Sequence, residues 1–327
     1  MKFATQLGTS LQTLLRTAAL SAAAVGTVTV GTVTVGILAS AQQAQAGTFH
    51  NGWNYSIDSF NDGTEGRIIG ENSKFEFYGM ASKQTKDKVY FAFTSNLSLN
   101  GYDDAGALNK KISYGDLFLN FTNPTSFNQA DGKLYGVRFD NTNDTRFTSQ
   151  RTVTSGRRTR TITETKAPEL GLYQNVTTTS YTTRNRGYSS PDHHTKTVAS
   201  YKGQASYGDL AANTSYFDNS KAALTNMASG SFLGGIQAIA DFKGLGLDFA
   251  NFNTKGTYTF GFSIDKALLP NGKFVANLFA ECGNDGMVLT GELTDVPEPS
   301  VMAGLAVVGL TVAASRVKKV AKQQAAS

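Results

Sequence analysis

The chain has 327 residues, of which 17% are charged and 11% are aromatic, and its formal net charge is +5. Six of the 30 basic residues and one of the 25 acidic residues lie in the terminal segments 1–46 and 297–327, so residues 47–296 carry 24 of each and are neutral. A neutral body excludes the basic surface of a typical nucleic-acid-binding protein. The single cysteine, Cys282, excludes an intrachain disulfide. It ends an apolar run, so we expect a buried thiol.

Residues 1–46 have the pattern of a long secretory signal peptide. Two basic residues are the only charges there, and the run 17–40 is uncharged. Ala44-Gln45-Ala46 supplies the small-x-small pattern that signal peptidase accepts, so we expect a signal helix that is cleaved before Gly47. A permanent N-terminal membrane anchor is the alternative, because the uncharged run is long enough to span a bilayer.

The body, residues 47–296, is expected to be mainly β. Its clearest segments alternate apolar and polar residues with period two, as half-buried strands do. These segments are Phe75–Gly79, Val89–Phe93, Leu117–Phe121 and Tyr258–Ile264. Met287–Leu293 is predicted to be a last strand before the C-terminal segment. We predict a β-sandwich or jelly-roll-like body with a few short helices. The candidates for the helices are 221–228, 235–243 and a single helical turn at 265–269.

Residues 138–202 form the basic part of the body, with 11 basic and 5 acidic side chains. Six arginines are interleaved there with threonine and serine: Arg151, Arg157, Arg158, Arg160, Arg184 and Arg186. The pattern is typical of a solvated hairpin or loop, and contact with an acidic polysaccharide is the alternative. No aromatic residue lies between 148 and 172, so we predict no nucleic-acid site.

The motif Ser-Tyr-Gly-Asp-Leu occurs twice, at 113–117 and at 206–210. The sequences diverge directly after each copy, so we predict a duplicated turn-and-strand element at most. We therefore expect one β-rich extracellular domain over 47–296, with the basic Thr/Ser-rich segment near 148–200 as an insertion.

No group of residues in the sequence has the spacing of a metal site. Adjacent His193 and His194 point in different directions on a strand or a helix, and the preceding turn residues favour a surface loop. The clusters Asp103-Asp104, 140–144 and Asn284-Asp285-Gly286 match no complete calcium loop, so we interpret them as turns. We predict no metal and no cofactor.

Catalytic residues are equally hard to assign. Five glutamates are candidates for a glycosidase pair: Glu65, Glu71, Glu76, Glu281 and Glu292. Sequence alone places no two of them at the separation that glycoside hydrolysis needs, and no nucleophile elbow or phosphate loop is present. We predict that the protein is not an enzyme. Trp53 and Tyr55 are the candidate residues for stacking on a sugar ring.

The segment 297–327 has the composition of a protein-targeting signal. It begins Pro297-Glu298-Pro299, continues with the uncharged run 301–315, and ends in a basic tail. The basic residues of the tail are Arg316, Lys318, Lys319 and Lys322. Fifteen helical residues extend about 22 Å, less than the roughly 30 Å hydrocarbon core, so the pattern indicates a transient transmembrane helix with a cationic stop.

This tail resembles the PEP-CTERM sorting signal that an exosortase processes. Blocks of the body also resemble the cyanobacterial branch of exosortase-dependent surface proteins: 52–63, 75–79, the two Ser-Tyr-Gly-Asp-Leu copies, 268–272 and 278–286. One departure is the tail, in which a single arginine is followed by lysines where the family has a compact arginine-rich stop.

The resemblance implies export by the secretory machinery, transient membrane tethering through the C-terminal helix, and cleavage near Pro297-Glu298-Pro299 by an exosortase. The product would join the cell surface or the extracellular matrix, with exopolysaccharide as a candidate partner. We therefore expect a structural or adhesion protein. A lectin-like carbohydrate-binding module is the alternative, and a polysaccharide-active enzyme is the less favoured third interpretation.

Overall fold

The structure, a computed structural model, describes residues 47–122, 126–254 and 256–295. The expected signal peptide with Ala44 and Ala46, and the expected sorting signal from Pro297 onward, lie outside the described residues. Within the described ranges, no helix has both the length and the apolar character needed to cross a membrane.

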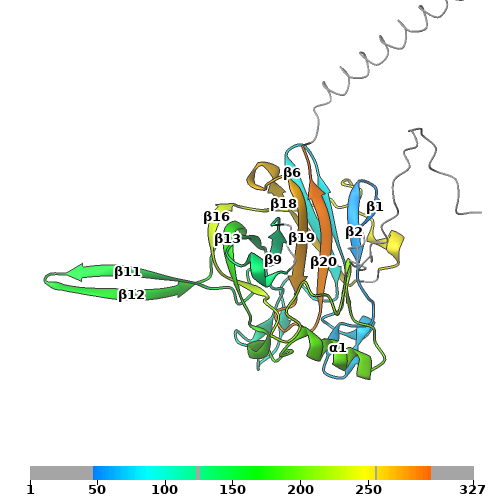
Figure 1. Ribbon diagram of the computed structural model, residues 1–327, viewed down its shortest axis with the longest axis horizontal. Coiled ribbons are helices and arrows are strands. Elements are labelled where there is room, and N and C mark those ends of the chain that lie inside the picture. Colours follow the sequence, from blue (N-terminus) through cyan, green and yellow to red (C-terminus); the bar gives the residue numbers. More distant parts are fainter. Residues whose placement is uncertain (1–46, 123–125, 255, 296–327) are drawn as a thin grey trace, which may run out of the picture. The chain divides into compact units, whose positions relative to one another are not determined.

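The described chain is mainly β, as predicted, and twelve of its strands form two six-stranded antiparallel sheets (Figure 1). In spatial order, the first sheet contains β1 (Thr48–His50), β2 (Trp53–Ile57), β5 (Phe77–Gln84), β6 (Lys88–Ser95), β18 (Tyr258–Asp265) and β17 (Gln237–Ala238). The second contains β16 (Asn226–Gly234), β13 (Gly171–Thr179), β10 (Leu134–Arg138), β9 (Leu117–Asn120), β19 (Gly272–Phe279) and β20 (Gly286–Leu293).

Smaller elements connect these strands. Four two-stranded ribbons are β3 (Thr64–Glu65) with β4 (Ile68–Ile69), β7 (Tyr102–Asp103) with β8 (Lys111–Ile112), β11 (Phe147–Ser155) with β12 (Arg158–Lys166), and β14 (Ser206–Tyr207) with β15 (Leu210–Ala211). The helices are α1 (Pro191–Ser200) and the 3-10 turns η1 (Gly70–Asn72), η2 (Asn128–Ala130), η3 (Thr182–Asn185), η4 (Phe249–Phe252) and η5 (Lys266–Leu268).

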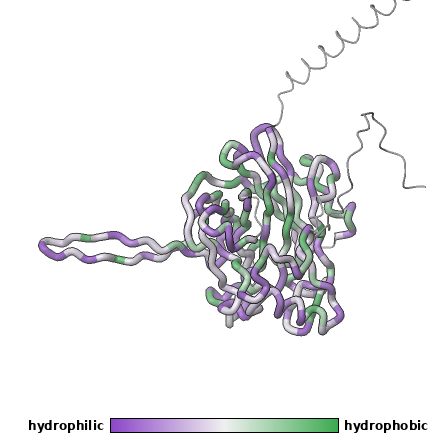
Figure 2. Tube along the Cα trace, viewed as in Figure 1, coloured by the Kyte–Doolittle hydropathy of each residue, from purple (hydrophilic) through white to green (hydrophobic). Residues whose placement is uncertain are grey.

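The main core lies between the two sheets, as in a β-sandwich. Phe91 and Phe262 of the first sheet pack in one cluster with Leu278 and Leu289 of the second. Figure 2 shows the apolar stretches gathered along the central strands. The outer faces are covered as well, by the segment around Phe249 on the first sheet and by the segment around Phe217 on the second. Strand β2 alternates aromatic and polar residues but is almost wholly buried. Trp53 and Tyr55 pack under the segment around Phe249, whereas Asn54 and Ser56 donate hydrogen bonds to backbone carbonyls of β20.

The aspartates of the two Ser-Tyr-Gly-Asp-Leu copies make the same contact with different strands. Asp116 of the first copy accepts the Met227 N–H at 2.7 Å, and Asp209 of the second accepts the Thr290 N–H at 2.7 Å. Gly208 has φ +63° and lies so close to Ser56 that a Cβ atom would clash with its Oγ. The shared feature is therefore an aspartate that satisfies a strand N–H. The backbone differs, because the second copy makes a turn at Gly208, whereas residues 113–117 lead into β9 without a turn.

The predicted helices differ from those in the structure. The turn at 265–269 is confirmed by η5, but 221–228 and 235–243 are not helices, because β16 and β17 occupy parts of them as sheet strands. Helix α1 was expected to be a loop. Its N-cap is Ser190, whose side chain accepts the His193 N–H at 3.1 Å, and proline stands at its first position.

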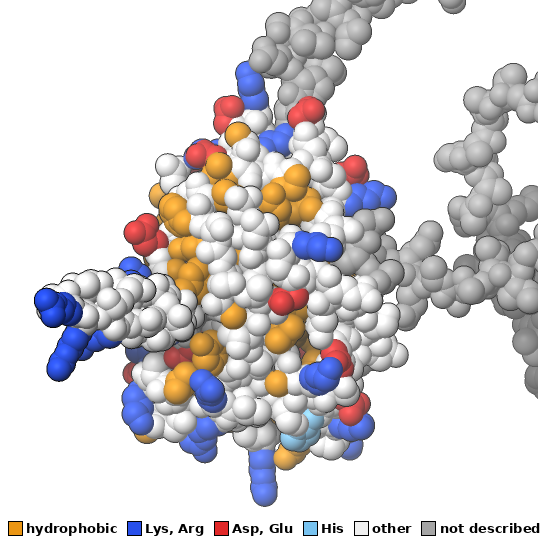
Figure 3. All heavy atoms as spheres, turned by 60° about the vertical axis from the view of Figure 1, so that its left-hand side comes forward, with side chains coloured by type: hydrophobic (Ala, Val, Ile, Leu, Met, Phe, Trp, Pro, Cys, Tyr) orange, Lys and Arg blue, Asp and Glu red, His pale blue; other side chains and the backbone are white. Residues whose placement is uncertain are grey.

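The basic segment is also more varied than a single insertion. Hairpin β11–β12 projects from the sandwich and is exposed along its length, so the expected solvated hairpin is confirmed there. Basic side chains lie at the projecting end in the space-filling view (Figure 3), and Arg158 is at this end of the register, whereas Lys166 lies at the base opposite Phe147. The remainder of 148–200 is not inserted, because β13 pairs with both β10 and β16 inside the second sheet.

Candidate functional site

Four carboxylates meet at one end of the sandwich, and we call them the acidic cluster: Asp58, Asp62, Glu76 and Asp285. Asp58 directly follows β2, and Glu76 directly precedes β5, both in the first sheet. Asp285 directly precedes β20 in the second sheet. Asp62 lies in the loop between β2 and β3. The cluster therefore lies where strand ends of both sheets come together.

All four side chains are withdrawn from solvent. Asp58 is 6% exposed, Asp285 is 1% exposed, and Asp62 and Glu76 are fully buried. Asp58, Asp62 and Asp285 each offer one carboxylate oxygen within 4.8 Å of the other two. In the described part of the chain, no other group of three or more histidine, cysteine or acidic side chains is brought together in this way.

Backbone N–H groups fix each carboxylate from one side. Asp58 Oδ1 accepts the N–H of Ser59 and of Gly208, each at 2.9 Å, and the Ser206 hydroxyl. Each of the other three carboxylates also accepts a hydrogen bond of 2.7 Å from a backbone N–H. The donor is Ser206 for Asp62, Gly63 for Glu76 and Phe77 for Asp285. These bonds hold the side chains in one orientation without neutralising them.

Three carboxylate oxygens in the cluster have no partner in the described structure. They are Asp58 Oδ2, Asp62 Oδ1 and Glu76 Oε1, and each atom is inaccessible to solvent. A buried acceptor with no donor loses its water hydrogen bonds without compensation, which costs free energy. Unpartnered oxygens on three neighbouring carboxylates indicate that a ligand outside the polypeptide completes the site.

No lysine or arginine in the described ranges balances this charge. Among the described residues, the ion pairs that lysine and arginine make with carboxylates lie outside the acidic cluster. The nearby His194 does not contribute a charge, because burial lowers its pKa to about 4. At neutral pH its Nε2–H donates to the Asp62 backbone carbonyl at 2.9 Å.

Burial and mutual repulsion determine the protonation of the cluster. Burial is the largest cause that raises the pKa of all four carboxyls above the ordinary range. The charge of neighbouring members raises the pKa of Asp62, Glu76 and Asp285 further. Four adjacent carboxylates without a cation are not all ionised. The set therefore either holds protons or binds a hard cation through oxygen.

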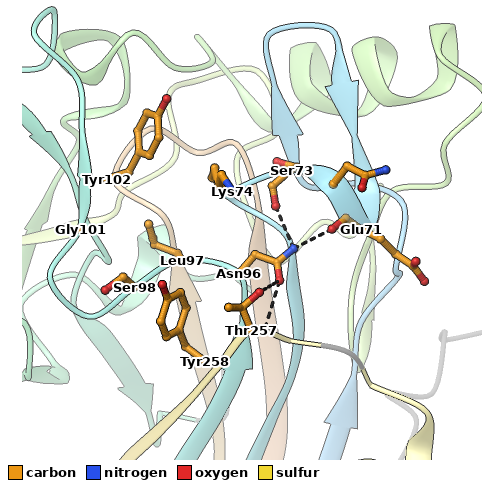
Figure 4. Close-up of a pocket in the computed structure, with 11 residues that line it drawn as sticks. Glu71, Ser73, Lys74, Asn96, Leu97, Ser98, Gly101, Tyr102, Thr257 and Tyr258 are labelled. Carbon is orange, nitrogen blue, oxygen red and sulfur yellow. Dashed lines mark hydrogen bonds between the residues drawn. The ribbon is translucent and has the colours of Figure 1, made fainter.

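A shallow hollow of about 590 Å³ leads to the cluster from solvent. Asp58 lines it together with residues of the following loop and with Gln204. Glu71 and Asn72 line both this hollow and a second one, which is drawn in Figure 4. Asp58 is therefore the member of the cluster that borders the hollow.

The second hollow, of about 390 Å³, is lined mainly by polar groups. Asn96 organises it: its Nδ2 donates to the backbone carbonyls of Glu71 and Ser73 at 2.9 Å, and its Oδ1 accepts from the Thr257 hydroxyl at 2.9 Å (Figure 4). Tyr102 and Tyr258 line the same space, and Tyr258 is 44% exposed. Sequence analysis did not single out these tyrosines, since aromatic residues are frequent along the chain.

A separate buried polar network surrounds Arg138, which is 3% exposed. Its guanidinium donates to Asn143 Oδ1 at 3.0 Å, and Asn143 in turn donates to Asp116 at 2.9 Å. Glu281 accepts the Asp144 N–H at 2.6 Å and lies at the margin of the same network. We call this set of residues the arginine network.

The proposed sugar-stacking residues are not available at the surface. Trp53 is fully buried and Tyr55 is 1% exposed. The segment after β17 covers both: Trp53 Nε1–H donates to the Leu245 carbonyl at 2.9 Å, and the Tyr55 hydroxyl accepts the Asp248 N–H at 2.8 Å. The prediction that these rings contact a glycan is therefore wrong, because their faces pack against the protein.

The structure confirms the prediction for Cys282 and differs from the predictions for other candidate residues. Cys282 is fully buried, as expected, and burial raises its pKa to about 12. His193 is exposed, as expected, and His194 is buried, but both lie in helix α1, so the predicted surface loop is wrong. Of the candidate glutamates, Glu76 and Glu281 are buried in separate polar groups, whereas Glu292 is exposed on β20.

The acidic turns also divide into two kinds. Asp103 is exposed and pairs with Lys111 at 2.6 Å, as a turn residue would. Asp140 and Asp144 belong to the arginine network and are buried. Asp285 lies in a turn as predicted, but its carboxylate also joins the acidic cluster, which a turn interpretation alone does not explain.

Comparisons of the chain with family models, with curated proteins and with solved structures find no match.

Proposed function

We propose that this chain is an exported structural or adhesion protein of the cell surface or extracellular matrix, processed by an exosortase. The observation that carries the proposal is the tail, in which Pro297-Glu298-Pro299, an uncharged run and a basic end follow one another. The described fold is compatible with this: β20 ends at Leu293, so the last strand ends before the expected cleavage site begins.

The sandwich-like body supports a structural role through its closed core. Both faces of both sheets are covered, and large apolar side chains are buried in three clusters. Of the candidate glutamates, Glu76 and Glu281 are buried, so neither is open to a substrate at the surface. The hairpin β11–β12 is the exposed feature that suits contact with an acidic exopolysaccharide, because Arg151, Arg158 and Arg160 lie along it.

Terminal mapping of the protein from a host that contains an exosortase tests the sorting proposal. Intact-mass analysis should show a C-terminus near Pro299 and an N-terminus at Gly47. The variant Glu298→Gln should accumulate with its tail attached, whereas the matched control Glu292→Gln, on the folded body, should be processed normally. A native protein that keeps its residues beyond Pro299 contradicts the proposal.

A carbohydrate-binding module is the second candidate function, and the hollow in Figure 4 favours it. Two tyrosines, an asparagine and backbone carbonyls around a solvent-open space are typical of a saccharide subsite. Retention of the protein on envelope polysaccharides should fall several-fold in Tyr258→Ala. Tyr201→Ala, which alters a similarly exposed tyrosine elsewhere, should bind as the unaltered chain does. Absence of retention on every such polysaccharide contradicts this function.

A further inference from the structure

We propose that the acidic cluster is a calcium site, in which Asp58, Asp62 and Asp285 coordinate one Ca²⁺ and Glu76 completes the carboxylate shell. The proposal rests on geometry within the described body and is independent of export. It corrects the expectation that the chain contains no metal site.

The spacing of the oxygens fits calcium. Ca²⁺ takes six to eight oxygen ligands at about 2.3–2.6 Å, so two ligands on opposite sides of the ion lie about 5 Å apart. The oxygens of the three aspartates fall within 4.8 Å of one another, as ligands around one such ion would. Mg²⁺ requires distances near 2.1 Å and a regular octahedron that usually keeps several waters.

The donor types exclude softer metals from this site. Zinc prefers thiolate and imidazole ligands. The imidazole of His194 is near the cluster, but its Nε2 is already bonded to the Asp62 carbonyl. The Cys282 thiol keeps its proton at neutral pH, because burial raises its pKa to about 12. The remaining donors are carboxylate oxygens, which suit a hard cation.

The unpartnered oxygens distinguish this cluster from an ordinary group of acidic residues. Asp58 and Asp62 are both more than nine-tenths buried, and each uses one oxygen for N–H groups while the other has no donor. Glu76 repeats the arrangement, with Oε2 bonded and Oε1 unpartnered. The N–H bonds orient the carboxylates, and a cation satisfies the oxygens that these bonds leave over.

Binding at this point would join the two sheets. Asp58 and Glu76 are continuous with β2 and β5 of the first sheet, and Asp285 is continuous with β20 of the second. The Phe77 N–H already reaches across to the Asp285 carboxylate at 2.7 Å. A bound ion would add a stronger link between the same strand ends and hold the Ser206–Gly208 turn through Asp58.

Thermal unfolding of the chelator-treated full chain tests the proposal. Added Ca²⁺ should raise the melting temperature by several degrees in a saturable manner, with one ion bound per chain by titration calorimetry. Mg²⁺ at equal concentration should give a much smaller shift. Absence of any Ca²⁺-dependent shift, or an equal shift with Mg²⁺, overturns the assignment.

Substitutions separate ion binding from ordinary destabilisation. Asp62→Asn and Glu76→Gln keep the shape of each side chain and the acceptor for the backbone N–H, but they remove charge. Both should weaken Ca²⁺ affinity at least tenfold and, in chelator, melt at or above the temperature of the unaltered chain. Asp209→Asn is the matched control, since Asp209 is largely buried but bonds to Thr290 outside the cluster. If all three variants respond alike to Ca²⁺, the cluster does not bind it.

Discussion

The acidic cluster and the arginine network are both buried groups of carboxylates, but they are balanced differently. In the network, burial raises the pKa of Asp116 to about 6. Hydrogen bonds from the Met227 N–H, Thr145 and Asn143, and then the positive charge of Arg138, oppose this rise. In the cluster, the pKa shifts of the four carboxyls include no contribution from a lysine or arginine in the described chain. The network therefore contains a protein cation beside Asp116, whereas the cluster requires protons or an external cation.

Hydrogen bonding supports the same distinction. Both oxygens of Asp116 have donors, with Asn143 on one and Thr145 and the Met227 N–H on the other. Asp58, Asp62 and Glu76 each lack a donor on one oxygen. Asp116 is thus fully satisfied within the protein, although Glu281 and Asp140 each have one oxygen without a donor. The cluster, with three such oxygens on neighbouring carboxylates, gains stability when a ligand binds.

Replacing Arg138 in the arginine network should have the largest effect on the free energy of unfolding. Arg138→Met leaves the buried carboxylates without their cation and removes donors to Asn143 and to the Pro168 carbonyl. We expect a loss of about 3–5 kcal/mol in the free energy of unfolding, measured by denaturant titration. Arg160→Met, on the exposed hairpin, should change it by less than about 0.5 kcal/mol. Equal effects would show that Arg138 does not balance the network.

Removing the charge of Glu281 should have an intermediate effect on the free energy of unfolding, and this effect should depend on pH. Burial first, and then the charges of Asp144 and Asp116, raise the pKa of this carboxyl well above its usual value. Its protonated form therefore contributes stability that is fully present below the ordinary pKa and is lost as pH rises through the raised pKa. Glu281→Gln cannot ionise.

In saturating calcium, the stability of Glu281→Gln relative to the unaltered chain should therefore increase as pH rises from 5 to 8. The gain is about 1.4 kcal/mol for each pH unit between the usual and the raised pKa. Denaturant titrations at several pH values measure it. A stability difference that is independent of pH would mean that the Glu281 carboxyl titrates normally.

Introducing a lysine beside the acidic cluster should have the smallest effect on the free energy of unfolding. Gln204 is exposed and lines the same hollow as Asp58. Gln204→Lys should stabilise the chelator-treated protein by about 0.5–1 kcal/mol and weaken calcium binding, because its ammonium group partly replaces the ion. Gln204→Glu is the control and should shift both quantities in the opposite direction. Identical results for the two variants would exclude an electrostatic effect.

Much of the fold could be predicted from local sequence patterns. The period-two segments at 89–93 and 258–264 lie in strands, and the segment 117–121 lies in β9 except for its last residue, because alternation reflects which side chains face a core. Helix α1 had a readable signal as well, since Ser190 and Pro191 form an N-cap and a first-turn proline. The segment 221–228 was mistaken for a helix because its strand residues are specified by pairing with β13, a contact that local composition does not reveal.

The acidic cluster could not be predicted from local sequence patterns, and the reason is physical. Its members lie in sequence blocks that were each recognisable, but their meeting depends on how the two sheets pack. Phe77 and Asp285, which bond directly, are 208 residues apart. For Trp53 the sequence led to the opposite error. Its ring was predicted to contact a glycan at the surface, but the segment that carries Leu245 covers it. Local sequence indicates strands and turns, whereas burial of a charge depends on tertiary contacts.

The most direct test of the central claim is the metal content of the purified chain. After equilibration with calcium and removal of unbound ions, elemental analysis should find one calcium per chain in the unaltered protein and in Asp209→Asn. The double variant Asp62→Asn/Asp285→Asn should retain almost none while remaining folded by circular dichroism. Calcium that is absent from the unaltered protein, or that is kept by the double variant, would contradict the account.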